Sequence, residues 1–266
     1  NSIFRLNYRY KIGTLNDSKQ ALATQYIQFL GTDTMTAEQI SKAFYKIACS
    51  FNISSGEEYT TVSIEGLQEN FEKAVQLYEE VISNAKADEK ALTALKARIA
   101  KSRKDVKANK NAILQGLTSY ATYGPVNKFN SILTTAELES LTTEDLMSRL
   151  KNMNNYEQTI IYYGPAPLAT VVKQIKGLHK VPASFTATPA SKVFKPLLQT
   201  QNQVFFTNYD MVQAETRWVR NTETYDANKN AIITVFNNYF GDIVFQTIRE
   251  SKALAYSTYG YYVEPQ

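Results

Sequence analysis

Arg249 and Tyr256 lie seven positions apart in TIRESKALAYSTYG, where a helical pattern gives way to a strand-like one. A guanidinium stays charged and presents a planar fork of N–H donors, and a phenol adds a short, directional O–H donor. Together they could stabilise a carbonyl oxygen that gains negative charge during attack. Neither group is a nucleophile or a base at neutral pH, so the pair could assist hydrolysis but could not begin it. Such residues are more often surface and packing residues, so the surrounding elements must decide between the two interpretations.

Residue types that bind metal ions are scarce in this chain. Cys49 is the sole cysteine and His179 the sole histidine, which excludes an internal disulfide and any thiolate metal site. We expect Cys49 to be a small core residue. We expect His179, in KGLHKVP and far from any helix that could present it, to be an ordinary surface or loop histidine. The chain is therefore predicted to bind no zinc by itself.

The 266 residues exceed one typical domain, so we expect one full domain and part of another. Hydrophobic residues make up 44% and charged residues 20%, a composition that excludes disorder. The sequence contains no apolar run near the roughly 18 residues that a membrane span needs. It opens on NSIFRLNYRY, with neither Met nor an apolar signal core, so we expect an excised piece whose cellular address cannot be read.

The stretch KARIAKSRKDVKANK (residues 96–110) carries seven cations against a single acid, Asp105. Beside them runs an apolar stripe at helical spacing, made by Leu92, Leu95, Ile99 and Val106. This pattern is typical of a solvated helix. No nucleic-acid motif accompanies it, so we rank a nucleic-acid-binding function last.

Periodicity predicts the order of elements in the first part of the chain. Strands are predicted in IFRLNYRYKIG (3–13), in CSFNISSG and EYTTVSIEGL as a hairpin around Gly56, and in YEQTIIYYG with a doubly buried centre. Helices are predicted over 18–30 ending at Gly31, from the T-x-x-Q capping box at Thr36, over 71–82, from Asp88, and in TTEDLMSRLKNM and LATVVKQIKGL. The proline-containing stretch 181–196 is predicted to be a linker.

After this linker the order of elements starts again. VQAETRWVRN (212–221) reads as a strand, NKNAIITVFNNYFG as a helix ending at a glycine, IVFQTIRES as a second helix and ALAYSTYGYYV as a strand. Residues 3–64 show the same order, a little over 200 residues earlier. We therefore predict an α+β fold built from a duplicated domain, with a mostly antiparallel sheet and helices packed on one face. The domains would be residues 1–180, a linker at 181–196, and a truncated second copy at 197–266.

A duplicated α+β domain whose second copy carries TIRESKALAYS resembles the insulysin and pitrilysin family of zinc metallopeptidases, which includes the mitochondrial processing peptidase. The likeness runs through the whole chain. It implies a clam-shell chamber made of two halves, with zinc chemistry in the first half and substrate-binding support from the second. The partners it implies are a peptide substrate and a zinc-bearing half, in the same polypeptide or in a partner subunit.

In that family an inverted zinc motif, H-x-x-E-H, lies on the opening helix a few residues before a Gly-Thr pair. Here the pair is Gly31 and Thr32, and the motif positions hold Leu22, Gln25 and Tyr26. None of these can ligate zinc or take a proton from a zinc-bound water. The resemblance therefore implies that this is the non-zinc half and that zinc belongs to the facing half.

The family's non-zinc half presents an arginine and, seven residues later, a tyrosine that point toward the zinc site. Arg249 and Tyr256 match this spacing, so the resemblance implies that they bind substrate and stabilise the oxyanion. One departure is that only Gly241 and Asp242 remain where the family has a glycine-rich turn between two helices. The alternative function is a catalytically inactive binding or scaffold subunit of the same fold, like the core proteins of the respiratory bc1 complex.

Overall fold

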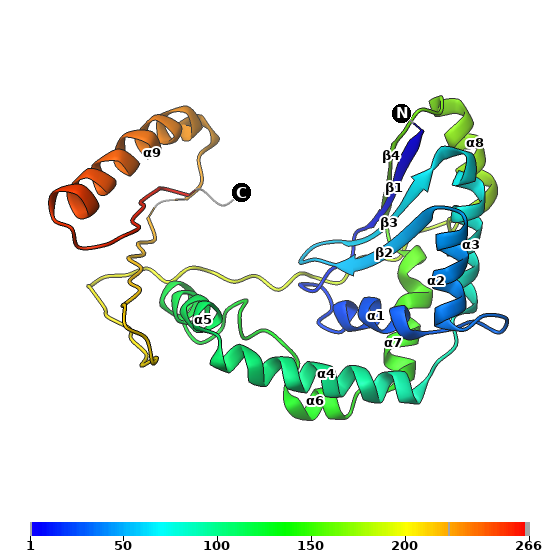
Figure 1. Cartoon of the computed structure of the whole chain (residues 1–266), viewed down its shortest axis with the longest axis horizontal. Coiled ribbons are helices and arrows are strands. Elements are labelled where there is room, and N and C mark those ends of the chain that lie inside the picture. Colours follow the sequence, from blue (N-terminus) through cyan, green and yellow to red (C-terminus); the bar gives the residue numbers. More distant parts are fainter. Residues whose placement is uncertain (1, 223, 264–266) are drawn as a thin grey trace. The chain divides into compact units, whose positions relative to one another are not determined.

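The computed structural model describes residues 2–222 and 224–263 of the chain. It separates into two compact units, drawn in Figure 1. Unit 1 comprises Asn1–Pro196 and Gln203–Arg217, and unit 2 comprises Leu197–Asn202 and Trp218–Gln266. Across the described residues, no helix is both long enough and apolar enough to cross a membrane.

Unit 1 is built on a four-stranded antiparallel sheet with the order β2-β3-β1-β4. The strands are β1 (Ile3–Tyr10), β2 (Cys49–Ser55), β3 (Thr60–Leu67) and β4 (Gln158–Tyr163). Alternate residues of β1 enter the core, with Phe4, Leu6 and Tyr8 fully buried. This is the period-two pattern that the sequence showed, and it leaves Arg5, Asn7 and Arg9 of β1 on the other face of the sheet. The predicted hairpin is confirmed, because β2 and β3 pair antiparallel on either side of Gly56.

Strand β4 differs from its prediction. It pairs only with β1 and forms an edge of the sheet, rather than a centre buried on both faces. Its residues alternate between half-buried and exposed, and Ile161 is 46% exposed. The continuous apolar run IIYY predicted burial on both faces, but only Ile160 and Tyr162 pack on the core. Ile161 and Tyr163 lie on the open face of the sheet.

Two helices follow β1 and lead to the hairpin. Helix α1 (Gln20–Tyr26) continues into a 3₁₀ turn, Ile27–Phe29. Helix α2 (Ala37–Lys46) begins at the predicted capping box, in which Thr36 Oγ1 accepts the N–H of Gln39 and Gln39 Oε1 accepts the N–H of Thr36. The local sequence thus determined where α2 starts.

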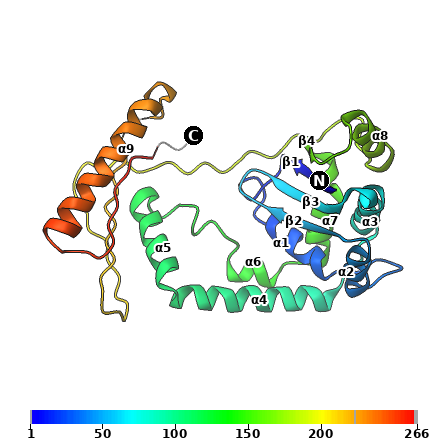
Figure 2. The ribbon, with the colours of Figure 1, turned by 45° about the horizontal axis from the view of Figure 1, so that its top comes forward.

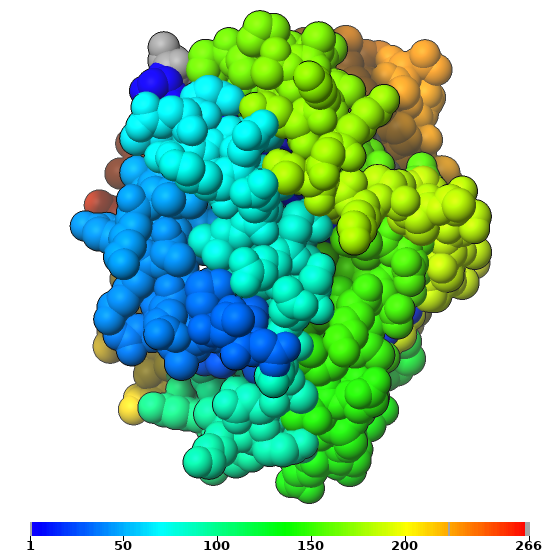
Figure 3. All heavy atoms as spheres, turned by 90° about the vertical axis from the view of Figure 1, so that its right-hand side faces the viewer, coloured from blue at the N-terminus to red at the C-terminus, as the bar shows by residue number. Residues whose placement is uncertain are grey.

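Helices cover one face of the sheet, as predicted (Figure 1). The apolar stripes of α3 (Phe71–Asn84), α7 (Thr143–Asn152) and α8 (Leu168–Leu178) join the residues of β1 and β3 in one core. Figure 3 shows α2 in blue, α3 in cyan, α7 in green and α8 in yellow-green lying side by side as the outer layer. The predicted α+β class is confirmed, and Cys49 is buried in this core as expected.

The basic stretch forms most of α4 (Glu89–Ala108), whose N-cap is Asp88 as predicted. Leu92 and Leu95 are buried and Ile99 packs against the core, but Val106 is 41% exposed, so the stripe leaves the core before its last residue. The helix ends at Asn109, which also caps the next helix. Two helices had no sequence prediction, α5 (Lys110–Tyr123) and α6 (Thr135–Glu139), and Figure 2 shows them beyond and beside α4.

Residues 181–196 contain no helix or strand, as expected of a linker. Thr186 makes an isolated bridge to Tyr156 beside the start of β4. The domain boundaries at 180 and 197 stay a prediction.

Unit 2 contains a 3₁₀ turn (Ala227–Lys229), helix α9 (Asn230–Val244) and a π-helical segment, Phe245–Ser251. The helix runs without a break through Gly241, so the predicted helix end at this glycine is wrong. The predicted strands at 212–221 and in ALAYSTYGYYV are also wrong for the described residues, which form no strand there. A strand requires a hydrogen-bonded neighbour, and alternation of residue types alone does not supply one.

Candidate functional site: an arginine and tyrosine pair

The structure brings Arg249 and Tyr256 together in unit 2. The guanidinium carbon of Arg249 lies 5.6 Å from the centroid of the Tyr256 ring. It also lies 4.8 Å from the centroid of the Phe245 ring, one helical turn earlier. Both distances are within the range of a cation–π interaction. The two side chains that the sequence spacing singled out are therefore in contact in the structure.

The backbone explains how residues seven positions apart come into contact. The π-helical segment ends at Ser251, and Ala253 takes a left-handed conformation with φ 49°. Its N–H donates to the carbonyl of Arg249 at 3.1 Å, and the N–H of Leu254 donates to that of Ile248 at 3.0 Å. These bonds close the helix end and turn the chain back along the helix. Tyr256 consequently returns to the level of Arg249.

Both side chains are accessible to a ligand. The Arg249 side chain is 40% exposed and Tyr256 is 87% exposed. The nearest carboxylate is Glu250, with Oε1 at 3.6 Å from Arg249 Nε, a loose ion pair. The N–H edge of the guanidinium and the phenolic O–H are therefore both free to donate hydrogen bonds to an oxygen acceptor.

The three α1 positions Leu22, Gln25 and Tyr26 lie in unit 1 and make structural contacts. Leu22 packs on the core. Gln25 Oε1 accepts a hydrogen bond from the guanidinium of Arg98 on α4 at 3.1 Å. The ring of Tyr26 is fully buried, and its hydroxyl is bonded to the backbone of Asp88. Burial raises the pKa of Tyr26, which keeps the phenol protonated and able to donate.

The hydrogen bond from Arg98 to Gln25 places a positively charged guanidinium beside α1. The Arg98 guanidinium lies 5.1 Å from the centroid of the Phe29 ring, beside Gln25. A fixed positive charge at this position disfavours a second cation nearby. Over the residues that the structure describes, no group of three or more His, Cys, Asp and Glu side chains could hold a metal ion.

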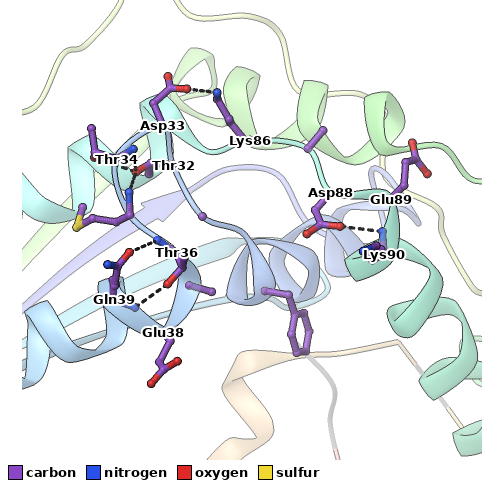
Figure 4. Close-up of a pocket in the computed structure, with 15 residues that line it drawn as sticks. Thr32, Asp33, Thr34, Thr36, Glu38, Gln39, Lys86, Asp88, Glu89 and Lys90 are labelled. Carbon is purple, nitrogen blue, oxygen red and sulfur yellow. Dashed lines mark hydrogen bonds and ion pairs between the residues drawn. The ribbon is translucent and has the colours of Figure 1, made fainter.

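A groove of about 990 Å³ lies beside α1, between the loop after it and the loop before α4 (Figure 4). Two interactions connect the loops on either side of the groove. Asp33 forms an ion pair with Lys86, and the backbone N–H of Lys86 donates to the carbonyl of Gly31 at 2.9 Å. Asp88 caps α4 by accepting from the backbone N–H of Lys90 at 2.8 Å. Sequence reasoning did not predict this groove, although the capping signals at Thr36 and Asp88 mark its two rims.

The expectation for His179 is wrong. The residue is 4% exposed and directly follows α8. Its Nδ1 lies 2.7 Å from Glu79 Oε1, its Nε2 lies 2.9 Å from Gln158 Oε1, and its ring stacks on Tyr8 at 4.5 Å. The sequence position beside a linker suggested exposure, but α8 packs on α3 and carries the histidine into the core.

The comparisons with known proteins decide the family. The family model described as Insulinase (Peptidase family M16) matches residues 20–160, more than half of the chain. The chain belongs to the insulinase family. The proposed resemblance is thus confirmed at the level of the family.

Relatives of this insulinase-family chain are longer than the chain itself. It is 25% identical over 248 residues to the uncharacterized zinc protease YmxG of Bacillus subtilis, covering 90% of this chain and 58% of that protein. Its fold is similar to the periplasmic protease PqqL of Escherichia coli, with a TM-score of 0.72 at 14% identity over 97% of this chain and 29% of that one. It is also similar to a peptidase M16 inactive domain of Pseudomonas fluorescens, with a TM-score of 0.68 at 13% identity over 99% of this chain and 66% of that one. The chain therefore spans about three fifths of the curated relative's length and less than a third of PqqL.

The sequence resemblance predicts an inverted zinc motif on the opening helix, α1. In this chain that helix supplies a leucine, an amide and a buried tyrosine instead. Arg249 and Tyr256 are both hydrogen-bond donors, and their role toward a substrate stays a prediction.

Proposed function

We propose that this chain is the non-zinc half of an insulinase-family zinc endopeptidase, and that it closes over a peptide held by the zinc-bearing half. Arg249 and Tyr256 donate hydrogen bonds to the peptide carbonyl as it becomes an oxyanion. The observation that carries this proposal is the contact between the Arg249 guanidinium and the Tyr256 ring, with both side chains accessible.

The α1 positions support the division of roles. Leu22 and Gln25 lack the groups that bind zinc or take a proton, and the Tyr26 hydroxyl is committed to Asp88. The zinc must therefore be held by another part of the enzyme. The part of the PqqL chain that this sequence does not cover is long enough for such a half.

The proposal is tested with the full-length protein, including its zinc-bearing half. Tyr256→Phe removes one hydroxyl and keeps the ring, and Arg249→Lys keeps the charge but loses the planar fork. Each change is expected to lower kcat/KM on an internally quenched peptide about a hundredfold, because loss of one oxyanion donor costs ~3 kcal/mol. Zinc content should stay constant, since neither residue binds the metal.

Two matched changes serve as controls. Tyr259→Phe and Arg220→Lys alter exposed residues of the same types in unit 2 and should leave kcat/KM unchanged. Equal activity in all four variants would refute the oxyanion role. A full-length protein that cleaves no peptide and carries no zinc would instead favour an inactive binding or scaffold subunit.

A further inference from the structure

Two alanines of the described chain share an unusual backbone conformation. Ala48 and Ala253 both have φ 49°, and no other residue except glycine has a positive φ in the part that the structure describes. Left-handed backbone is unfavourable for residues with a Cβ, so it persists only where the surroundings require it. Both alanines follow the end of a helix, α2 in unit 1 and the π-helical segment in unit 2.

The same sequence offset relates three pairs of residues around these turns. It separates Ala48 from Ala253, Phe44 from Arg249, and Phe51 from Tyr256. In unit 1 the rings of Phe44 and Phe51 lie 4.8 Å apart at an angle of 41°. A helix followed by a left-handed alanine therefore brings residues seven positions apart into contact in both units, whatever their side chains are.

The two units use this local geometry differently. In unit 1 the pair is aromatic, and Phe44 is 3% exposed within the core. In unit 2 the pair is an arginine and a tyrosine, and Tyr256 is 87% exposed. The backbone turn that serves packing in unit 1 thus presents two hydrogen-bond donors to solvent in unit 2.

Phe245 restricts the guanidinium further. The Arg249 guanidinium lies over the Phe245 ring at 4.8 Å as well as over the Tyr256 ring at 5.6 Å. Phe245 is the first residue of the π-helical segment. Such segments are rare in proteins overall, but those that occur are often found at functional sites. Contacts with two rings limit the rotamers of a long side chain and leave its N–H edge for a ligand.

We propose that Ala253 and Phe245 are positioning residues for the oxyanion donors: the left-handed turn at Ala253 sets Tyr256 beside Arg249, and the Phe245 ring fixes the plane of the guanidinium. The inference rests on the proposed function of the pair. Both residues would act through Arg249 and Tyr256, and neither is given a role in contacting the substrate.

Substitutions at Ala253 test the turn in the full-length enzyme. Ala253→Gly keeps the turn, because glycine adopts positive φ freely, and should leave kcat/KM on the internally quenched peptide within about twofold. Ala253→Val should lower kcat/KM about tenfold or more, since a β-branched residue disfavours this conformation. Ala255→Val adds the same methyl groups two residues later, where φ is not positive, and should be neutral.

A double-mutant cycle distinguishes an effect of Ala253 through Tyr256 from a loss of activity that does not involve Tyr256. If Ala253 acts through Tyr256, then Tyr256→Phe should cost about a hundredfold in the parent enzyme but only about tenfold in an Ala253→Val background that has already lost about tenfold. Additive losses in the two variants would overturn the role of the turn. Equal activity of the Gly and Val variants at position 253 would overturn it as well.

Phe245 is tested by a change that keeps apolar volume. Phe245→Leu removes the aromatic ring and should lower kcat/KM about two- to fivefold. Phe245→Tyr keeps an aromatic ring under the guanidinium and should have the kcat/KM of the parent. Nuclear magnetic resonance of the Arg249 Nε–H group gives a readout independent of activity. Its ring-current shift should decrease in Phe245→Leu and Ala253→Val and persist in Phe245→Tyr and Ala253→Gly.

The two proposals fail in different ways. If Tyr256→Phe has full activity while the Arg249 resonance responds as described, the oxyanion function is wrong and the positioning geometry stands. If Tyr256→Phe is slow while Ala253→Val and Phe245→Leu change neither the resonance nor the rate, the function stands and the positioning inference is wrong.

Discussion

The hydroxyl of Tyr26 accepts the backbone N–H of Asp88 at 2.7 Å and donates to the backbone carbonyl of the same residue at 2.9 Å. This two-way bond joins the end of α1 to the start of α4. Tyr26 is also one of the three positions at which the sequence resemblance predicts the zinc motif, and here its hydroxyl bonds to the backbone of Asp88.

Tyr26→Phe keeps the buried ring and removes only the hydroxyl. The variant should lower the free energy of unfolding by about 1–3 kcal/mol, because the Asp88 backbone loses its partner. Urea unfolding monitored by circular dichroism measures the difference. Tyr45→Phe is the matched control, since Tyr45 is 85% exposed and should change stability by less than ~0.5 kcal/mol.

The purified chain should contain far less than one equivalent of zinc. The α1 positions offer no ligand atoms, and the Arg98 guanidinium already lies beside Gln25. Plasma emission spectrometry after gel filtration in buffer containing zinc measures the metal content. Tight one-to-one binding would contradict the assignment of this chain as the non-zinc half.

His179→Phe should destabilise unit 1 although it keeps an aromatic ring against Tyr8. A carboxylate oxygen only accepts hydrogen bonds, so the short contact places a proton on Nδ1 between His179 and Glu79. Phenylalanine would leave Glu79 and Gln158 without this partner, at a cost of about 2–3 kcal/mol. Chemical unfolding should show this loss, whereas Lys180→Ala at the exposed neighbour should not. Unchanged stability in His179→Phe would show that the polar contacts contribute nothing.

Asp145 should make unit 1 sensitive to acid. The hydrogen bond from Lys19, and then the N–H of Thr142, lower the pKa of Asp145 from 3.8 to about 2. A carboxyl whose pKa is lower in the folded state stabilises the protein above its unfolded pKa and loses that contribution as the pH falls through the folded pKa. The parent protein should therefore lose about 1–2 kcal/mol of stability between pH 4 and pH 2 through this group, after allowance for solvent screening.

Asp145→Asn isolates the charge in this prediction, because asparagine can still accept the Thr142 N–H. The variant should be less stable than the parent at pH 7 and should lack this part of the acid dependence. Asp105→Asn, on the exposed face of α4, should follow the parent profile. Identical acid profiles for all three proteins would assign no role to the pair of Lys19 and Asp145.

The sequence alone determined the elements whose signals are local. The capping box at Thr36 determined the start of α2, Asp88 determined the start of α4, and alternation located β1 and the hairpin. Each signal depends on hydrogen bonds or side-chain periodicity within a few residues, so no distant contact is needed to interpret it. The spacing of Arg249 and Tyr256 was readable for the same reason.

Only the tertiary structure decided the properties that depend on distant partners. The segment IIYY is half exposed because it lies in β4, at the edge of the sheet. His179 is buried because α8, which it follows, packs beside α3. The segments 212–221 and 253–263 form no strand in the described residues, since alternation cannot supply a neighbouring strand. The contact of Arg249 with Tyr256 likewise required the left-handed turn at Ala253, because a backbone dihedral of one alanine is set by the surrounding fold and not by its residue type.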